Sequence, residues 1–197
     1  MLDDAAIERL VEEARAGDAW AFGRLFDHYH LPVYRFVASR VRRPSDVEDL
    51  TQLVFVKALE ALPRYESRGV PFGGWLFRLA RNAVIDHIRT SHEHADLAQS
   101  VEQPGHDAGP DELAVARQDI EAVRSALSTL TDDQRDAIAL RFFAGLSARE
   151  AAEAMGKQEG TIRGLQFRAI AALRRQLGIE APEVQATAPS PARPRVS

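Results

Sequence analysis

The chain of 197 residues contains no cysteine. The absence of thiols excludes a disulfide framework, a thiolate zinc site and a cysteine nucleophile, and it suits a reducing compartment. The longest apolar runs are four or five residues, at 53–56 and 169–173, whereas a helix that crosses a bilayer needs about 20. No basic segment leads into an apolar run near residue 1, so no secretory signal is expected. These absences predict a cytoplasmic protein without membrane insertion.

Basic residues are also missing from one whole stretch, 93–116, which carries six acidic side chains. Residues 1–92 hold 13 basic and 13 acidic side chains, and residues 117–179 hold ten basic and eight acidic ones, so the net charge of −4 arises mainly in the middle of the chain. Pro-Gly and Gly-Pro steps interrupt this stretch, as is typical of a flexible linker. The tail at 180–197 has four prolines and is expected to be disordered. We therefore predict two domains, 1–92 and 117–179, joined by an acidic linker.

Both predicted domains have helical periodicity, and neither has an alternating strand pattern of useful length. Asp18 is placed to cap the second helix. Ser45 and Glu48 have the spacing of a capping box that opens a third helix, whereas Pro32 is expected to kink or interrupt the helix around it. A further helix is predicted over 72–90. The fold class is therefore all-α.

The predicted helix at 72–90 has one apolar face and one face with a different chemistry. A projection at about 100° per residue gathers the following residues on the second face: Trp75, Arg78, Arg81, Asn82, Asp86 and Arg89. Arginine neutralises phosphates, and an aromatic ring stacks on an unpaired base, which contributes about 1 to 3 kcal/mol. The pattern favours binding of single-stranded nucleic acid. A solvated charged face with the tryptophan folded onto it is the alternative.

The preceding helix combines aliphatic and acidic groups on the face opposite its buried stripe. Leu53 and Val56 lie there among Asp46, Asp49 and Gln52. Such a face is typical of a docking site for a helix of another protein. The alternative is that the two aliphatic residues pack on a neighbouring helix of the same bundle, and the spacing leaves both possibilities open.

The second domain has the spacing of a helix-turn-helix motif. Ser147 and Glu150 form a capping box ahead of a short helix that ends at Gly156, and a second helix is predicted from about 160 to 177. Four arginines and no acid lie along 161–175, opposite the apolar face. A basic helix of this size can enter the major groove of duplex DNA. A merely solvated helix is the alternative.

These segments resemble regions two and four of bacterial sigma factors of the extracytoplasmic-function group. The sequence DVEDLTQLVF at 46–55, followed by WLFRLARNAVID at 75–86, is similar to region two, and EAA at 150–152 with GTIR at 160–163 is similar to region four. The resemblance implies a region-two helical bundle, a region-four helix-turn-helix and a nonenzymatic transcription initiation factor without a cofactor. It also implies binding to the clamp and flap of core RNA polymerase and to promoter DNA, with an anti-sigma factor as a further candidate partner.

The resemblance and the helical projections assign three sets of residues. Polymerase contacts are expected from Asp46, Asp49, Gln52, Leu53 and Val56. Contacts with the melted minus-ten element are expected from Arg68, Trp75, Arg78, Arg81, Asn82 and Arg89. Contacts with the minus-thirty-five duplex are expected from Gln158, Thr161, Arg163, Gly164, Phe167 and Arg168. The family commonly continues with Ser-Arg-Leu where this chain has Gly164-Leu165-Gln166, so the promoter sequence that is recognised cannot be carried over.

Two pairs of closely spaced histidines do not predict a metal site. His28 with His30, and His92 with His94, are spaced i, i+2, which does not place two ligands on one face of a helix. No nucleophile or glycine-rich phosphate loop accompanies Asp86 and His87, so no catalysis is expected.

The length of the predicted linker suits a protein that recognises two sites. Its 24 residues can reach at most ~80 Å, and two sites about two DNA turns apart are separated by ~70 Å. Its acidic side chains should repel duplex phosphates, so a path through a basic protein channel is a hypothesis.

Two other classes of protein also fit parts of the pattern. A stand-alone helix-turn-helix repressor or activator would bind palindromic duplex DNA tightly by itself, with two copies per site. An interaction-only regulator would sequester a partner through its first domain and carry a vestigial helix-turn-helix.

Overall fold

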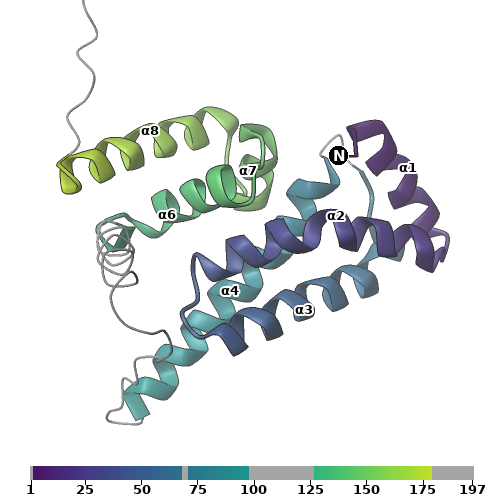
Figure 1. Cartoon of the computed structure of the whole chain (residues 1–197), viewed down its shortest axis with the longest axis horizontal. Coiled ribbons are helices and arrows are strands. Elements are labelled where there is room, and N and C mark those ends of the chain that lie inside the picture. The colour runs from purple at the N-terminus through teal and green to yellow at the C-terminus, as the bar shows by residue number, and fades with distance from the viewer. Residues whose placement is uncertain (1, 68–70, 98–126, 179–197) are drawn as a thin grey trace, which may run out of the picture.

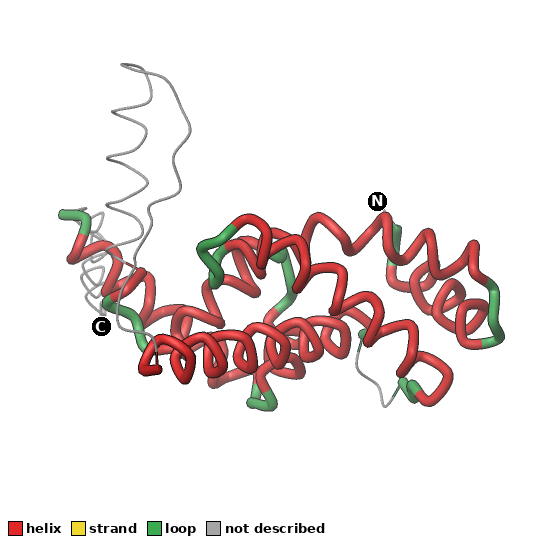
Figure 2. Tube along the Cα trace, turned by 90° about the horizontal axis from the view of Figure 1, so that it is seen from below, coloured by secondary structure: helices red, strands yellow, loops and turns green. Residues whose placement is uncertain are grey.

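The computed structural model describes residues 2–67, 71–97 and 127–178, with residues 92–97 described by their backbone alone. Every regular element in these ranges is helical, as the sequence predicts (Figure 2). The elements are α1 (Asp4–Arg15), α2 (Ala19–Ala38), α3 (Pro44–Ala61), the 3-10 turn η1 (Leu62–Arg64), α4 (Phe72–Leu97), α6 (Asp132–Ile138), the π-helical turn η2 (Ala139–Phe143), α7 (Ala148–Met155) and α8 (Glu159–Gln176).

Two helix starts test the predicted caps. Asp18 caps α2, and its carboxylate accepts hydrogen bonds from the backbone N–H groups of Trp20 and Ala21 at 2.8 and 3.2 Å. The capping box predicted at Ser45 is wrong, because α3 begins at Pro44 and no side chain caps it. Proline at the first helical position lacks the N–H that a cap would satisfy, and its fixed φ already suits the helix.

The predicted interruption of α2 and the predicted end of α4 are both wrong. α2 continues through Pro32 as one helix. The buried residues Tyr29 and Val33 flank the proline on the core side, so tertiary packing outweighs the local loss of one hydrogen bond. α4 continues past the predicted end at Thr90 to Leu97, so the first residues of the predicted linker are helical. The rest of that linker and the predicted tail lie outside the described residues.

The first half of the chain, α1 to α4, surrounds a core of large apolar side chains. α2, α3 and α4 pack alongside one another, and α1 lies across the end of α2 (Figure 1). The large side chains that are fully buried there include Val33, Phe36, Val37, Val54 and Phe77. The apolar stripes predicted for these helices therefore face one common core.

The second half of the chain forms the predicted helix-turn-helix. Ser147 and Glu150 make both hydrogen bonds of a capping box at the start of α7. Gly156 ends that helix with φ 62°, in the left-handed region that favours glycine. Ile162, Leu165 and Ala169 of α8 are buried as predicted. The turn and the two helices are thus positioned by the residues that the sequence singles out.

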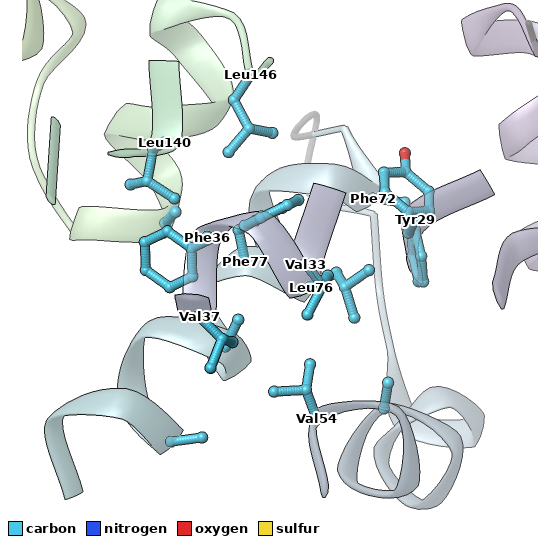
Figure 3. Close-up of a cluster of buried hydrophobic side chains, with 14 of the residues drawn as sticks. Tyr29, Val33, Phe36, Val37, Val54, Phe72, Leu76, Phe77, Leu140 and Leu146 are labelled. Atoms are coloured by element: carbon cyan, nitrogen blue, oxygen red, sulfur yellow. The ribbon is translucent and has the colours of Figure 1, made fainter. Parts of the chain in front are cut away.

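The two halves of the chain pack against each other and share one apolar core. α7 lies against α4, and η2 lies against α2. Leu140 and Leu146 of the second half lie beside Phe36 and Phe77 of the first (Figure 3), and all four side chains are buried. We call this packing of α6, η2 and α7 on α2 and α4 the closed arrangement.

Within the described ranges, none of the helices combines the length and the apolar character that a membrane span requires.

Candidate polymerase and nucleic-acid interfaces

The outer face of α3 carries the first set of predicted residues. Leu53 and Val56 expose 40% and 51% of their surface, and Asp49 and Gln52 beside them are exposed. The alternative that the two aliphatic residues pack inside the bundle is therefore wrong. Leu59, which is 53% exposed on the same helix, extends the apolar strip. Its i, i+3 spacing from Val56 is the sequence signal that marks it as part of this strip. We call Asp49, Gln52, Leu53, Val56 and Leu59 the α3 surface.

Asp46 differs from the other members of its predicted set. Its Oδ2 lies 3.5 Å from Nε2 of His87 on α4 and 3.9 Å from Nε of Arg43, and its side chain is only 24% exposed. Its position therefore favours holding α3 against α4 over facing a partner.

The polar face of α4 lies in a different environment from the one predicted. The projection places its three arginines in solvent, but Arg78 Nη1 lies 3.1 Å from Glu153 Oε1 of α7. Arg81 Nε donates to Asp136 Oδ2 of α6 at 2.7 Å, and the Arg81 side chain is 20% exposed. The prediction of a solvent-facing stripe is therefore wrong for Arg81, which lies against α6, whereas Arg78 keeps 48% of its side chain exposed beside α7. Periodicity locates a polar face, but it does not tell what packs there.

The remaining members of the second set divide between surface and interior. Asn82 and Arg89 are exposed, and Arg89 Nη2 lies 3.8 Å from Asp86 Oδ1 of its own helix. Trp75 is half-buried, with its ring centroid 4.8 Å from that of Tyr65 and 5.2 Å from that of Phe72. The tryptophan thus folds onto an aromatic cluster and shows solvent only a part of its ring. Arg68 lies outside the described residues.

A buried ionic cluster, which no local sequence pattern indicates, joins the two halves. Asp136 is 2% exposed, and its Oδ1 lies 3.1 Å from Nε of Arg40, whose side chain is 4% exposed. Asp136 Oδ2 accepts from Arg81, so one carboxylate lies between two guanidinium groups. Asp132 Oδ1 lies 3.5 Å from Nη2 of Arg40 at the edge of the cluster. Because the cluster exists only where α4 and α6 meet the turn that follows α2, no local pattern could reveal it.

Two titratable side chains of α2 have perturbed pKa values. Burial raises the pKa of Tyr29, and the negative charge of Glu150 on α7 raises it further. Burial lowers the pKa of His28, whose ring lies edge-on to Tyr29 with centroids 4.7 Å apart. Both side chains therefore stay neutral over a wider pH range than in water. The described residues contain no group of three or more side chains suited to a metal ion.

The outer face of α8 carries the third set of predicted residues. Gln158, Thr161 and Arg168 are exposed, and Phe167 exposes 76% of its surface. Arg163 is exposed and forms an ion pair with Glu159 one turn earlier. The face is therefore open, basic and centred on one aromatic ring.

The departure from the family pattern at 164–166 has a structural explanation. Leu165 supplies a buried side chain. Gln166 Oε1 accepts a hydrogen bond from Arg141 Nε at 3.2 Å, and Arg141 also donates to the carbonyl oxygen of Leu146. A Cβ at Gly164 would lie 3.6 Å from Nη1 of Arg168, so the guanidinium lies over the glycine. The three residues thus join α8 to η2 and position Arg168.

Family models and relatives match both halves of the chain. The model described as Sigma-70 region 2 matches residues 25–94, and the model described as Sigma-70, region 4 matches residues 126–175. The chain is 39% identical over 182 residues to the ECF RNA polymerase sigma factor BldN of Streptomyces coelicolor, which covers 89% of this chain and 67% of that protein. It is 36% identical to the ECF RNA polymerase sigma factor ShbA of Streptomyces griseus, over 88% of this chain and 97% of that one.

Two solved structures share the fold. CnrH in complex with the cytosolic domain of CnrY matches with a TM-score of 0.69 and 27% identity, over 89% of this chain and 99% of that chain. The sigma factor RpoE of Bartonella quintana in complex with the anti-sigma factor NepR matches with a TM-score of 0.65 and 26% identity, over 81% of this chain and 98% of that chain.

Proposed function

Since this chain belongs to the extracytoplasmic-function (ECF) group of the sigma-70 family and directs RNA polymerase to promoters, we propose how its surfaces divide that task. The α3 surface binds core polymerase, α4 serves melted minus-ten DNA, and α8 recognises the minus-thirty-five duplex. The chain acts without a cofactor and without catalysis of its own, in the cytoplasm where polymerase works.

The main support for these proposed roles is the chemistry of the outer face of α8. Arg163, Phe167 and Arg168 are exposed on a helix whose opposite face is buried. The helix follows a turn of helix-turn-helix geometry, and recognition helices of this motif lie in the major groove. Arginine binds phosphates or guanine edges, and an apolar ring contacts the thymine methyl group. This face therefore has the chemistry of direct DNA recognition.

The α3 surface supports polymerase binding for a different reason. Leu53, Val56 and Leu59 form an exposed apolar strip, and Asp49 and Gln52 border it. A strip of this kind fits the helix-in-groove mode of recognition, with apolar anchors at i and i+3 and polar groups at the rim. Core polymerase is the partner that the family membership indicates. Asp46 contributes by positioning α3.

An anti-sigma factor is a second class of partner. The relatives CnrH and RpoE were solved in complex with the cytosolic domain of CnrY and with the anti-sigma factor NepR. The shared fold supports an inhibitory protein as a further partner of this chain. A pull-down with the full chain from extract would test for polymerase and for an inhibitor at the same time.

In vitro transcription with purified core polymerase tests the proposed function. Addition of the wild-type chain should yield promoter-specific transcripts that core polymerase alone does not make. The Arg168→Ala variant should lower transcript yield about tenfold, since one good DNA contact contributes about 1 to 3 kcal/mol. The matched control is Arg9→Ala, which removes an exposed arginine from α1 and should leave the yield unchanged.

The same assay, together with a DNA footprint made without polymerase, separates the two other classes. A stand-alone repressor or activator would protect a palindromic site in the footprint and would never produce new transcripts. An interaction-only regulator would neither protect DNA nor start transcription. Either result would contradict the proposed function.

A further inference from the structure

The outer side of α2 carries a row of exposed side chains that none of the proposed roles uses. At about 100° per residue, four side chains gather within about 60° on the side of the helix opposite its buried residues. They are Trp20, Arg24, Asp27 and Leu31, and all four are exposed. We call these four residues the α2 face.

Two large apolar side chains mark the ends of the α2 face. Trp20 exposes 65% of its surface and Leu31 exposes 50%. The contact of α2 with α3 lies elsewhere, because Phe26, whose ring centroid is 4.6 Å from that of Phe55, is about 130° around the helix from the centre of the face. Large apolar side chains exposed at helical spacing are typical of a docking surface.

The order of residues in the α2 face is complementary to itself. The spacings of four, three and four residues are those of the seam along which two helices pack in a coiled coil. About a point between residues 25 and 26, the pattern is the same in both directions, with an apolar side chain at each end and two opposite charges inside. If two copies pack antiparallel, Trp20 of one copy meets Leu31 of the other, and Arg24 meets Asp27. Two-fold symmetry forms each contact twice.

The charges favour the antiparallel orientation over the parallel one. A parallel pair would place each charged residue against its own copy, and like charges at close range are unfavourable. Within the ranges that the structure describes, Asp27 forms no ion pair with its own chain. The guanidinium carbon of Arg24 lies 5.3 Å from the centroid of the Trp20 ring. Stacking uses the face of the guanidinium, so the N–H groups at its edge can donate to a carboxylate of a second copy.

We propose that two copies of the chain associate through the α2 face, antiparallel about a two-fold axis that passes between residues 25 and 26. A second copy is the occupant that fits, because the face supplies an apolar partner for each apolar end and an opposite charge for each charge. Specific stable interfaces bury about 1,200 to 2,000 Å², and one helix from each copy reaches only the lower end of this range. The dimer is therefore weak, and its population depends on protein concentration.

Sedimentation velocity of the full chain tests this proposal. Between about 5 and 300 µM, the wild-type chain should change from monomer to dimer. Arg24→Asp makes both charges of the face acidic, and Asp27→Arg makes both basic. Each variant alone should lose at least about tenfold in self-association, because like charges then oppose one another. An equimolar mixture of the two variants should form dimers again, since an acidic face meets a basic one.

A charge swap within one chain determines the orientation. The double variant Arg24→Asp, Asp27→Arg restores attraction in an antiparallel pair, where residue 24 meets residue 27, but leaves like charges opposed in a parallel pair. It should dimerise as the wild-type chain does. The matched control is Arg9→Asp, which reverses an exposed charge on α1 and should also dimerise normally.

A second variant tests the apolar ends without any change of charge. Trp20→Gln with Leu31→Gln should give a monomer at every concentration, because it removes both apolar contacts. Thermal unfolding of the dilute proteins should be similar for all variants, since the substituted side chains are exposed in the monomer. This comparison separates loss of the dimer from loss of the fold.

Three results would overturn the proposal. A wild-type chain that stays monomeric at every concentration excludes a second copy as the occupant of the α2 face. Undiminished self-association of both Arg24→Asp and the Trp20, Leu31 variant places the dimer contact elsewhere. A double charge swap that stays monomeric while the mixture of single variants associates excludes the antiparallel orientation. Polymerase and promoter DNA take no part in these measurements, so the proposed function is tested separately.

Discussion

At the scale of single residues, Asp136 has the most demanding environment in the described part of the chain. It is 2% exposed, and its two carboxylate oxygens face Arg40 and Arg81. Burial of charge is unfavourable unless each charge is paired. The stability of the closed arrangement therefore depends strongly on this one carboxylate.

Replacement of Asp136 should be costly. Asp136→Asn removes the negative charge and leaves the buried guanidinium of Arg40 without its main counter-ion, so we expect a loss of about 3 kcal/mol in the free energy of unfolding. Urea denaturation of the full chain measures this loss. Asp132→Asn is the matched control, since Asp132 is 82% exposed and its loss should cost at most about 0.5 kcal/mol. Equal effects of the two variants would contradict the role given to Asp136.

The α3 surface allows binding to be separated from stability. Leu53→Gln with Val56→Gln should lower the affinity for core polymerase by about tenfold or more, because each exposed apolar side chain contributes about 1 kcal/mol when a partner covers it. Thermal unfolding should change little, since both residues are already in solvent. Leu31→Gln on α2, where Leu31 is 50% exposed, is the control and should bind polymerase normally. Unchanged affinity of the double variant would remove α3 from the interface.

At the scale of elements, two serines with the same sequence signal have different roles. Ser147 caps α7 and accepts a hydrogen bond from the N–H of Glu150 at 3.2 Å, whereas Ser45 lies inside α3 and caps nothing. Ser147→Ala should lower the free energy of unfolding by about 1 kcal/mol, and Ser45→Ala should change it by much less. Hydrogen exchange of the first amides of α7 should accelerate only in the first variant. Equal destabilisation by the two substitutions would contradict this assignment.

The elements also show how far sequence reasoning reaches. Local chemistry predicted the cap of Asp18, the box at Ser147 and the left-handed turn at Gly156, because each depends on residues within one turn of chain. The predicted interruption at Pro32 and the predicted cap at Ser45 were wrong, because packing or a neighbouring proline overrides a local preference. The burial of Leu165 on the inner face of α8 was predicted from the 3.6-residue spacing of the apolar residues in that helix.

The candidate site was harder to predict than the fold. The face of α4 that holds Arg78 and Arg81 was located correctly along the helix, but its ionic environment was not predicted. That environment depends on Asp136 and Glu153, which are more than 50 residues away in sequence. Periodicity contains no information about such distant contacts. Arg40, which no motif marks, was missed for the same reason.

At the scale of the whole molecule, the acidic stretch at 93–116 connects the two halves. Replacement of its six acidic residues by glutamine should weaken binding to core polymerase by about three- to tenfold, if the stretch passes through a basic channel where opposite charges attract. Fluorescence anisotropy with labelled chain at low and moderate salt measures the effect, which should shrink as salt rises. Glutamine at Glu180 and Glu183 in the tail is the control. Identical binding by all three proteins would exclude an electrostatic role of the linker.

The paired glycines at the start of α4 have a consequence for local unfolding. Glycine lowers helix propensity by about 1 kcal/mol relative to alanine. Gly73 and Gly74 therefore weaken the first turn of α4, although they let α7 lie close to it. In the closed arrangement that turn is covered by α7. Without the cover of α7, this turn would fray more readily than the rest of α4, so its order depends on a contact with a segment that lies far away in the sequence.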